Sequence, residues 1–530
     1  MSRYSDLLQL PARAMDTFEP VDDQTPPSRW TGKRIVGIAV TVLILLRVAI
    51  DLVPIRVHIS PETTVIDGPL REDGTPDYEA YLNAHWSEGV TPENNAAVDL
   101  IRAFGPGIID EDTREAYFEH VGIPMPPLEG DYFVDFHEFM TLAATDWRGN
   151  SDESERLMRM RDDAQSRPWS PEEFPEIAEW LQVNEQPLEV ILTATNKPRY
   201  FSPLISPDDQ GLLNALLPVE QQTRAAARLI ITRAMFELQQ GNTDRALEFT
   251  LACHRLARLV SAHPTLIGSL VAYADDAIAS VGDEQIILSG QLTATRAYEY
   301  RQQFSRLSEF RPMQDVIDEG ERFLSLDTAC SLHSGLLSGE DVGQQLAMRI
   351  GFTPNPAMLR FNQMYDEIKT AMQLPKPLDR IRALEVVEQR VRTDAGPVKV
   401  KLLLGMLIST RRAIGEAVGG ILVAMMAPSV TQVVIAEERT KIRQQIVDLG
   451  YALAAHRAEA GSFPQSLEEL VPQQMDALPL DPFSGKPFRY RLTDNGFLLY
   501  SVGPNTFDDN GYGNGNADDT PFGDRPTDDE

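Results

Sequence analysis

The sequence predicts a mainly α-helical protein with one transmembrane helix near its N-terminus and a small α+β module at its C-terminus. Three observations lead to this fold class. An apolar stretch lies at residues 35–55, helical periodicity of apolar residues continues through most of the chain, and a loop-rich stretch with strand-like alternation ends it. At 530 residues the chain is too long for one hydrophobic core, so several domains are expected.

The predicted membrane span is Ile35–Ile55. It opens with twelve uncharged residues, and its whole length as a helix is about 31 Å, enough to cross the hydrocarbon core. Arg47 and Asp51 interrupt it, but they are four residues apart and can pair on one helix face. A cleaved signal peptide is the alternative. The long leader, residues 1–34, and the lack of a small-residue cleavage site argue against it.

Charge around this span predicts its orientation. Basic residues precede it at Arg29, Lys33 and Arg34, whereas acidic residues accumulate after Glu62. By the positive-inside rule the leader is cytoplasmic and the bulk of the chain is exported. We therefore expect a single-pass protein of the inner (cytoplasmic) membrane whose bulk is periplasmic or otherwise extracytoplasmic.

A second apolar stretch, Ala417–Ala436, leaves an alternative open. Its basic flank, Arg411 and Arg412, is also on its N-terminal side, so after an exporting first span it would insert against its charge bias. The stretch also contains Pro428 and several polar residues. We interpret it as a buried helix, with a second span as the alternative.

The exported region is expected to consist of a linker at 56–75 and an all-α body at 76–436. Helix-start signals such as Ser170-Pro171-Glu172-Glu173 precede long periodic runs. These runs include Phe174–Thr195, Glu220–Gln240, Thr243–Val260, Pro264–Val281 and Thr293–Leu307. The turn at Gly241-Asn242, followed by Ala246, resembles half of a tetratricopeptide unit. No second copy follows at a fixed period, so an ordinary helical hairpin is the alternative.

The composition excludes several classes of function. The net charge of −31 and the lack of a basic stripe argue against a nucleic-acid partner. The two cysteines, Cys253 and Cys330, form no disulfide scaffold, and whether they pair stays open. No hydrolase, metalloprotease or phosphate-loop motif is present, and the eight histidines are dispersed. The adjacent Asp275 and Asp276 point different ways on a helix.

The C-terminal segment, residues 437–530, has a different character. A long helix ends at Gly461, and a short helical turn follows with Leu467 and Leu470 on its packing side. The Asp494-Asn495-Gly496 turn then predicts a hairpin between a strand around Phe488–Tyr490 and a strand at Phe497–Gly503. We expect a small α+β module here.

This order of elements resembles the globular head of major pseudopilins from type II secretion systems. The resemblance rests on Tyr451, on Gly461-Ser462-Phe463-Pro464, on Asp481-Pro482-Phe483 and on Tyr500-Ser501-Val502-Gly503, and it covers about residues 440–520. The chain departs from the family because its apolar helix is not at a mature N-terminus behind a prepilin-peptidase site. We therefore do not expect it to be processed or assembled as a pilin subunit.

The resemblance also implies a calcium site. In the family the loop after the final strand binds Ca²⁺, and Asn505 stands where the family has its first aspartate ligand. Asp518 and Asp519 stand where it has an acidic pair, while Asp508 and Asp509 are alternative ligands because the loop is longer here. Carboxylate, amide and carbonyl oxygens are the ligands that Ca²⁺ prefers. A flexible acidic tail is the alternative.

Together these features predict a membrane-anchored interaction or structural protein of the cell envelope, in contact with secretion machinery or other protein partners. The alternative is an exported enzyme of the hydrolase type, with a site assembled from scattered residues of the helical body. The sequence favours the non-enzymatic interpretation because it contains no catalytic motif.

Overall fold

The computed structural model of the chain describes residues 34–42, 45, 56–143, 151–207, 211–215, 217–334, 353–395, 420, 430–513 and 518–524. The chain divides into two compact units, Met1–Pro54 and Ile55–Glu530.

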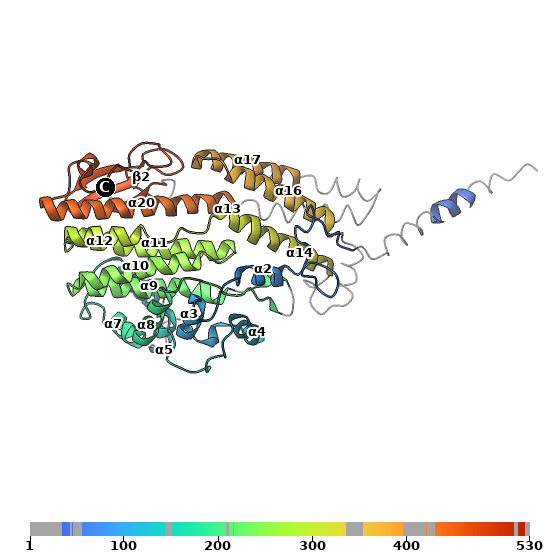
Figure 1. The fold of residues 1–530 in the computed structure, drawn as a ribbon, viewed down its shortest axis with the longest axis horizontal. Coiled ribbons are helices and arrows are strands. Elements are labelled where there is room, and N and C mark those ends of the chain that lie inside the picture. Colours follow the sequence, from blue (N-terminus) through green and yellow to red (C-terminus); the bar gives the residue numbers. More distant parts are fainter. Residues whose placement is uncertain are drawn as a thin grey trace, which may run out of the picture. The chain divides into compact units, whose positions relative to one another are not determined.

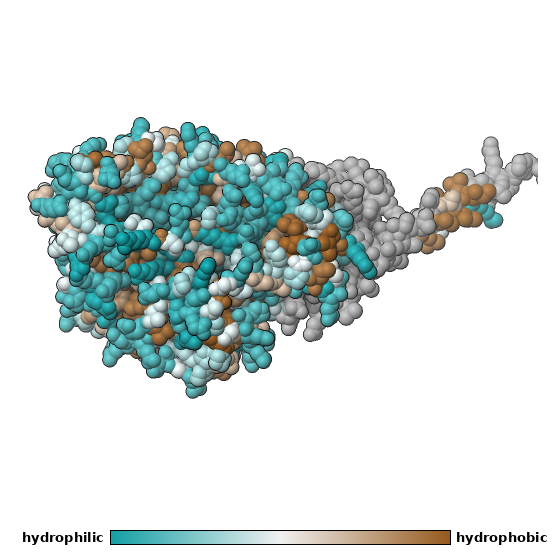
Figure 2. Space-filling model, viewed as in Figure 1, coloured by the Kyte–Doolittle hydropathy of each residue, from teal (hydrophilic) through white to brown (hydrophobic). Residues whose placement is uncertain are grey.

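In the first unit residues 34–42 form a helix whose apolar side chains are exposed, as Figure 2 shows, and Ile35 is 66% exposed. Apart from Leu45, the rest of the predicted span Ile35–Ile55 lies outside the described residues. No helix in the described part of the chain is both long and apolar enough to cross a membrane.

The second unit is mainly α-helical, with one three-stranded sheet among its described residues (Figure 1). Its first part contains α2 (Tyr78–Trp86), α3 (Ala96–Phe104), η1 (Pro106–Ile108), α4 (Glu111–Val121), α5 (Phe136–Ala143), α6 (Ser151–Ser166), α7 (Pro175–Val183), α8 (Glu185–Ala194) and η4 (Leu212–Asn214). The middle contains α9 (Pro218–Gln239), α10 (Thr243–Val260), α11 (Leu266–Ser289), α12 (Ala294–Phe304), α13 (Met313–Asp315), the π-helix η5 (Val316–Glu321) and α14 (Arg322–Ser334). The last part contains α16 (Asn355–Met372), α17 (Pro377–Ala395), α20 (Val430–Ala460), η8 (Leu467–Leu470), β1 (Arg489–Thr493), β2 (Gly496–Ser501) and β3 (Thr520–Gly523).

The helices α9, α10, α11, α12 and α20 lie side by side and form the centre of this unit (Figure 1). α11 packs against α9 and α10 on one side and against α20 on the other. Two glycines allow close helix contacts. A Cβ atom at Gly282 would meet Thr250 of α10 at 2.6 Å, and one at Gly450 of α20 would meet Ile287 and Phe522 at 2.9 Å. The C-terminal sheet therefore docks on the same helices that form the core of the body.

Local signals place most helix ends. α10 has the predicted bounds Thr243–Val260, because Gly241, with φ at +77°, ends α9 just before it. The prediction of one helix over Phe174–Thr195 is wrong, because α7 and α8 are separated at Asn184. The side chain of Asn184 exchanges hydrogen bonds with the backbone N–H and C=O of Val134, a tertiary contact that holds the break.

Two segments at predicted boundaries are packed into the second unit. In the predicted linker 56–75, Thr64 and Ile66 are buried, and Asn362 donates hydrogen bonds to the backbone carbonyls of Glu62 and Thr63. Of the apolar stretch Ala417–Ala436, the structure describes residue 420 and residues 430–436, and the latter begin α20. Val433 and Val434 are buried there. The predicted boundary between 436 and 437 lies inside α20, and the division into body and head stays a prediction.

The sheet has the order β1–β2–β3, and both pairs are antiparallel. β1 and β2 pair in a hairpin register, with Thr493 opposite Gly496, as the Asp494-Asn495-Gly496 turn predicts. Phe463, Phe497 and Phe522 form an aromatic group in the core of this region. The loop between β2 and β3 contains all five of the predicted metal-ligating residues.

Candidate functional site

The loop between β2 and β3 folds back on itself so that its two ends meet. Gly503 makes this possible, since its φ is +66° and a Cβ atom would lie 2.3 Å from the backbone oxygen of Asp518. The backbone N–H of Asn505 donates to Oδ2 of Asp518 at 3.0 Å, which ties the start of the loop to its end. The loop thus brings Asn505 into contact with Asp518.

Three carboxylates gather in this loop. Asp509, Asp518 and Asp519 each place an oxygen within 4.8 Å of the others. One oxygen of each is held by an N–H group: Asp509 accepts from Nδ2 of Asn505 at 3.0 Å, and Asp519 accepts from the backbone of Gly511 at 2.8 Å. The Oδ1 atoms of Asp518 and Asp519 are buried and have no hydrogen-bond partner among the residues that the structure describes. The cluster therefore has acceptor oxygens that the protein leaves unsatisfied.

The electrostatics of the cluster are unfavourable for three ionised groups. Burial raises the pKa of Asp518, and burial together with the charges of Asp509 and Asp508 raises the pKa of Asp519 to about 6. The charge of Arg439 acts in the opposite direction on Asp518. Within the described residues no lysine or arginine forms an ion pair with any of the three carboxylates. A bound cation would supply the missing positive charge.

The structure places the five predicted ligands in two groups. Asp509, Asp518 and Asp519 converge, and Asn505 lies beside them as a hydrogen-bond donor. Asp508 does not join them, because its carboxylate accepts from the hydroxyl of Tyr500 at 2.8 Å and pairs with Arg489 at 3.2 Å.

The residues present fit a hard cation. The donor set consists of carboxylate oxygens, which Ca²⁺ prefers, and two of these oxygens are buried without a partner. Asp509, Asp518 and Asp519 would hold the ion, and backbone carbonyls or water would complete the six to eight oxygens that Ca²⁺ takes.

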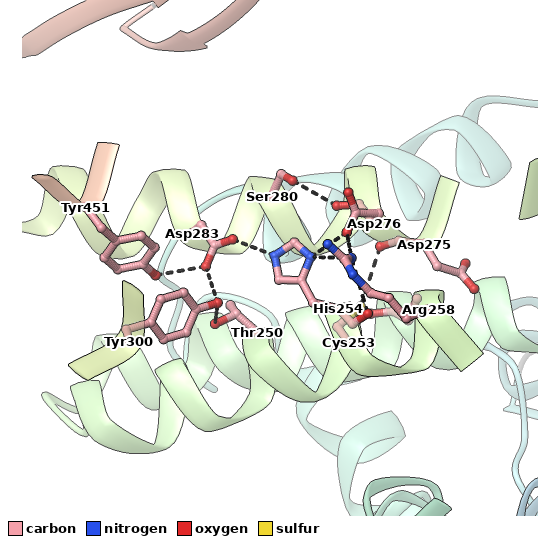
Figure 3. A network of polar contacts seen from close by, with 11 residues as sticks. Thr250, Cys253, His254, Arg258, Asp275, Asp276, Ser280, Asp283, Tyr300 and Tyr451 are labelled. Carbon is pink, nitrogen blue, oxygen red and sulfur yellow. Dashed lines mark hydrogen bonds and ion pairs between the residues drawn. The ribbon is translucent and has the colours of Figure 1, made fainter. Parts of the chain in front are cut away.

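A second cluster of charged residues lies where α10, α11, α12 and α20 meet (Figure 3). Its centre is His254, whose Nδ1 contacts Oδ1 of Asp276 at 2.6 Å and whose Nε2 contacts Oδ2 of Asp283 at 2.7 Å. Arg258 pairs with the same oxygen of Asp276. The other oxygen of Asp283 accepts from Tyr300 at 2.7 Å and from Tyr451 at 2.8 Å. We call these six residues the buried network.

The protonation of the buried network follows from its geometry. Each ring nitrogen of His254 faces a carboxylate, which favours a proton on each nitrogen. Burial alone would lower the pKa of His254, but the two carboxylates outweigh it and raise this pKa above its ordinary value. Arg258 and His254 lower the pKa of Asp276 in turn. The neighbouring Asp275 has no hydrogen-bond partner for either side-chain oxygen, and burial raises its pKa to about 8.

The sequence analysis did not predict this network. Helical spacing carried part of the signal, because His254 and Arg258 are four residues apart and Asp276 and Asp283 are seven apart. Both pairs therefore lie on one face of their helix. Nothing in the spacing shows that the two faces meet, since that depends on how α10 packs against α11.

The two cysteines are free thiols, so the disulfide that the sequence left open is not formed in this structure. Both are fully buried, and Cys253 lies next to the network with its Sγ 3.6 Å from the backbone oxygen of Asp275. Burial raises the pKa of each thiol, so neither is a reactive cysteine.

Comparisons of the chain with known protein families, with characterised proteins and with solved structures found no significant match. The resemblance of the C-terminal module to pseudopilin heads therefore stays a prediction from the sequence.

Proposed function

We propose that this chain is a membrane-anchored protein of the cell envelope that acts through interactions, with a pseudopilin-like head that binds Ca²⁺. The calcium site rests on one observation. Asp509, Asp518 and Asp519 place oxygens within 4.8 Å of one another, and two of the three residues have buried oxygens without a partner. Such a group is costly for a protein to bury unless a cation compensates it.

The order of elements supports the assignment of the head. A long helix, α20, ends at Gly461 and is followed by η8, where Ser466 and Glu469 form a capping box. A hairpin of β1 and β2 comes next, and the acidic loop connects it to β3. This is the succession of elements on which the resemblance to major pseudopilins is based.

The proposed membrane anchor is supported by the segment that precedes the second unit in the sequence. The helix at residues 34–42 exposes Ile35, Val36 and Ile38, each more than 60% accessible. Exposed apolar residues on one short helix are expected where a lipid phase covers them. With the basic residues before this helix, they support a single span with an exported second unit.

The alternative of an exported enzyme has less support. His254, Asp276 and Asp283 are the most suggestive group for catalysis, but all three are fully buried and their side chains are bonded to one another. A pocket of about 850 Å³ between the α12–α13 loop and α20 is lined by Arg258 of the network and not by His254. A general base must reach its substrate, so this arrangement favours a structural role.

Calcium titration of the full chain by isothermal titration calorimetry tests the site. We expect one ion to bind, and we expect the double substitution Asp518→Asn, Asp519→Asn to abolish binding. Asp494→Asn, an exposed acidic residue in the β1–β2 turn, is the matched control and should bind as the unchanged chain does. Failure of the unchanged chain to bind calcium, or equal binding by the double variant, would exclude the site.

Reporter fusions test the anchor independently of calcium. Fusions after Gly282 and at Glu530 should both report an exported location. A cytoplasmic signal at Glu530 alone would show that Ala417–Ala436 crosses the membrane, and the single-span topology would then be wrong.

A further inference from the structure

α20 is the helix that joins the head to the body, and its docking surface contains charged and polar contacts. Asp448 on α20 pairs with Arg301 on α12 through two contacts of 2.8 Å. On the same helix, Tyr451 stacks on Tyr300 of α12 with ring centroids 4.3 Å apart. The Tyr451 hydroxyl then reaches Asp283 of α11. The buried network is thus completed by a residue of α20 (Figure 3).

The charges of the network balance only when His254 carries a proton. Arg258 and the protonated His254 supply two positive charges, and Asp276 and Asp283 supply two negative ones. All four residues are at most 6% exposed, so solvent cannot screen an imbalance. If His254 lost a proton, one ring nitrogen would present a lone pair to a carboxylate oxygen less than 3 Å away.

Loss of the proton from His254 would weaken the packing of α20 through its effect on Asp283. Its Oδ2 faces His254, and its Oδ1 accepts both tyrosine hydroxyls, from Tyr300 and Tyr451. Without the imidazolium, Asp283 would be a buried carboxylate with no cation in contact, and such a charge strongly favours hydration over burial. Water can reach Asp283 only if a helix packed over it moves. Tyr451 covers Asp283 from α20.

We propose that the proton on His254 is a latch for the docking of α20 on α11 and α12, so that losing this proton loosens the head helix from the body. The other groups that face the site come from four helices, and among them Asp275, whose pKa burial raises to about 8, also titrates above neutral pH. On α10 these are Arg258 and Cys253, on α11 Asp275, Asp276 and Asp283, on α12 Tyr300, and on α20 Tyr451. Burial raises the pKa of both tyrosines and of Cys253, so the tyrosines stay donors while His254 titrates.

The direction of the pH dependence follows from linkage. Because the folded protein raises the pKa of His254 above its ordinary value near 6.5, the contribution of the latch is complete below that value. It is lost as the pH rises through the folded value. Between the ordinary value and the folded value, each pH unit should weaken the latch by up to about tenfold in the opening equilibrium, and above the folded value no further loss is expected.

Nitrogen NMR of the full chain labelled at histidine measures the proton directly. We expect His254 to keep the imidazolium signature, with both ring nitrogens protonated, at pH 6.5, the ordinary pKa at which a histidine without these contacts is half protonated. A neutral His254 at that pH would overturn the proposal.

Hydrogen exchange of α20, read on peptides around Tyr451 and corrected for intrinsic rates, measures the docking. We expect protection to fall as His254 titrates, while peptides of α9 stay protected. Asp283→Asn removes the charge that requires the proton and should abolish the pH step. Asp448→Asn is the matched control, because it breaks the contact with Arg301 and should weaken docking at every pH while the step remains. A step that persists in Asp283→Asn would overturn the latch.

Discussion

Two pairs of adjacent aspartates in this chain have opposite surroundings. Asp275 and Asp276 lie on α11 within the body, and Asp518 and Asp519 lie in the loop before β3. Asp276 is compensated by Arg258 and His254, whereas Asp518 and Asp519 have no ion pair among the described residues. The charge of Asp276 is thus compensated by neighbouring side chains, whereas burial raises the pKa of Asp275 to about 8. In the loop before β3, no side chain among the described residues forms an ion pair with Asp518 or Asp519.

The comparison shows that burial alone does not indicate function. Asp276 is fully buried and its Oδ2 has no hydrogen-bond partner among the described residues, but its Oδ1 pairs with Arg258 and His254, which is typical of a residue that specifies structure. Asp519 is 4% exposed and also has one oxygen without such a partner, but no lysine or arginine of the described part of the chain pairs with it, which is typical of a residue in a binding site. The incomplete group is therefore the better candidate for a binding site.

The largest effect is expected from breaking the compensated group. Asp276→Asn removes the carboxylate shared by His254 and Arg258. Both side chains then stay buried without the negative charge of Asp276. Removing one partner of a buried ion pair costs about 3–5 kcal/mol in the free energy of unfolding. Denaturant titration of the full chain, followed by circular dichroism, measures this loss.

Asp275→Asn is the matched control for that substitution. Asp275 is equally buried on the same helix, but burial raises its pKa to about 8, so its carboxyl is neutral at pH 7. An amide of the same shape should therefore change the free energy of unfolding by less than about 1 kcal/mol. Equal losses in the two variants would show that Asp276 is not the charge that matters.

The second effect concerns the uncompensated group. Calcium at a hundredfold excess over its Kd should stabilise the loop by about 2.7 kcal/mol, which corresponds to about hundredfold slower exchange of its protected amides. The amides of Asn505 and Gly511 report it, because they donate to Asp518 and Asp519. Magnesium should protect them less, since it demands a tighter octahedral geometry. Unchanged exchange with and without a chelator would leave only the flexible acidic tail.

The sequence predicted these two regions to different degrees. The bounds of α10 and the β1–β2 hairpin could be predicted because their signals, Gly241 and Asp494-Asn495-Gly496, are local. Asp518 and Asp519 were predicted as ligands from a resemblance, and the structure brings them together with Asp509. It sets Asp508 apart, because Arg489 on β1 pairs with it.

The buried network could not be predicted in the same way. Its members come from four helices, and Tyr451 is 168 residues away from Asp283 along the chain. Single-sequence spacing gives the face of a helix and not its neighbour. The break at Asn184 has the same origin, since the side chain that makes it is held by Val134 at a distance of 50 residues. Both features are products of tertiary packing.

The third effect is a contrast in pH response. The pKa of Asp519 is raised to about 6, so the folded loop binds a proton more readily than the unfolded chain. Without calcium, the loop should therefore lose stability as the pH rises from 4 through 6. Asp276, whose pKa is lowered, loses its contribution only as the pH falls well below 4.

Hydrogen exchange at pH 5 and pH 7 in a chelator, corrected for intrinsic rates, separates the two groups. The loop amides should exchange faster at pH 7 by no more than about tenfold, because the site is partly open to solvent. Peptides around Asp276 should not change between these values. Calcium should reverse the trend in the loop, since its binding displaces the proton. A loop that responds to pH as the body does would remove the distinction between the two groups.

The smallest effect is expected from two matched hydroxyls. Tyr451 donates to Asp283 in the buried network at 2.8 Å, and Tyr500 donates to Asp508 in the head at the same distance. Asp283 is fully buried, whereas the side chain of Asp508 is 39% exposed and can bond water instead.

A hydrogen bond to a buried charge contributes about 1.5–3 kcal/mol, and an exposed one contributes less. Tyr451→Phe should therefore lower the free energy of unfolding by about 1 kcal/mol more than Tyr500→Phe, because Tyr300 still donates to Asp283. Denaturant titrations of the two variants side by side measure the difference. Equal losses would mean that the buried network does not depend on its hydroxyl donors. A larger loss in Tyr500→Phe would show that the region around the β2–β3 loop depends more on its hydroxyl contact than the buried network does on that of Tyr451.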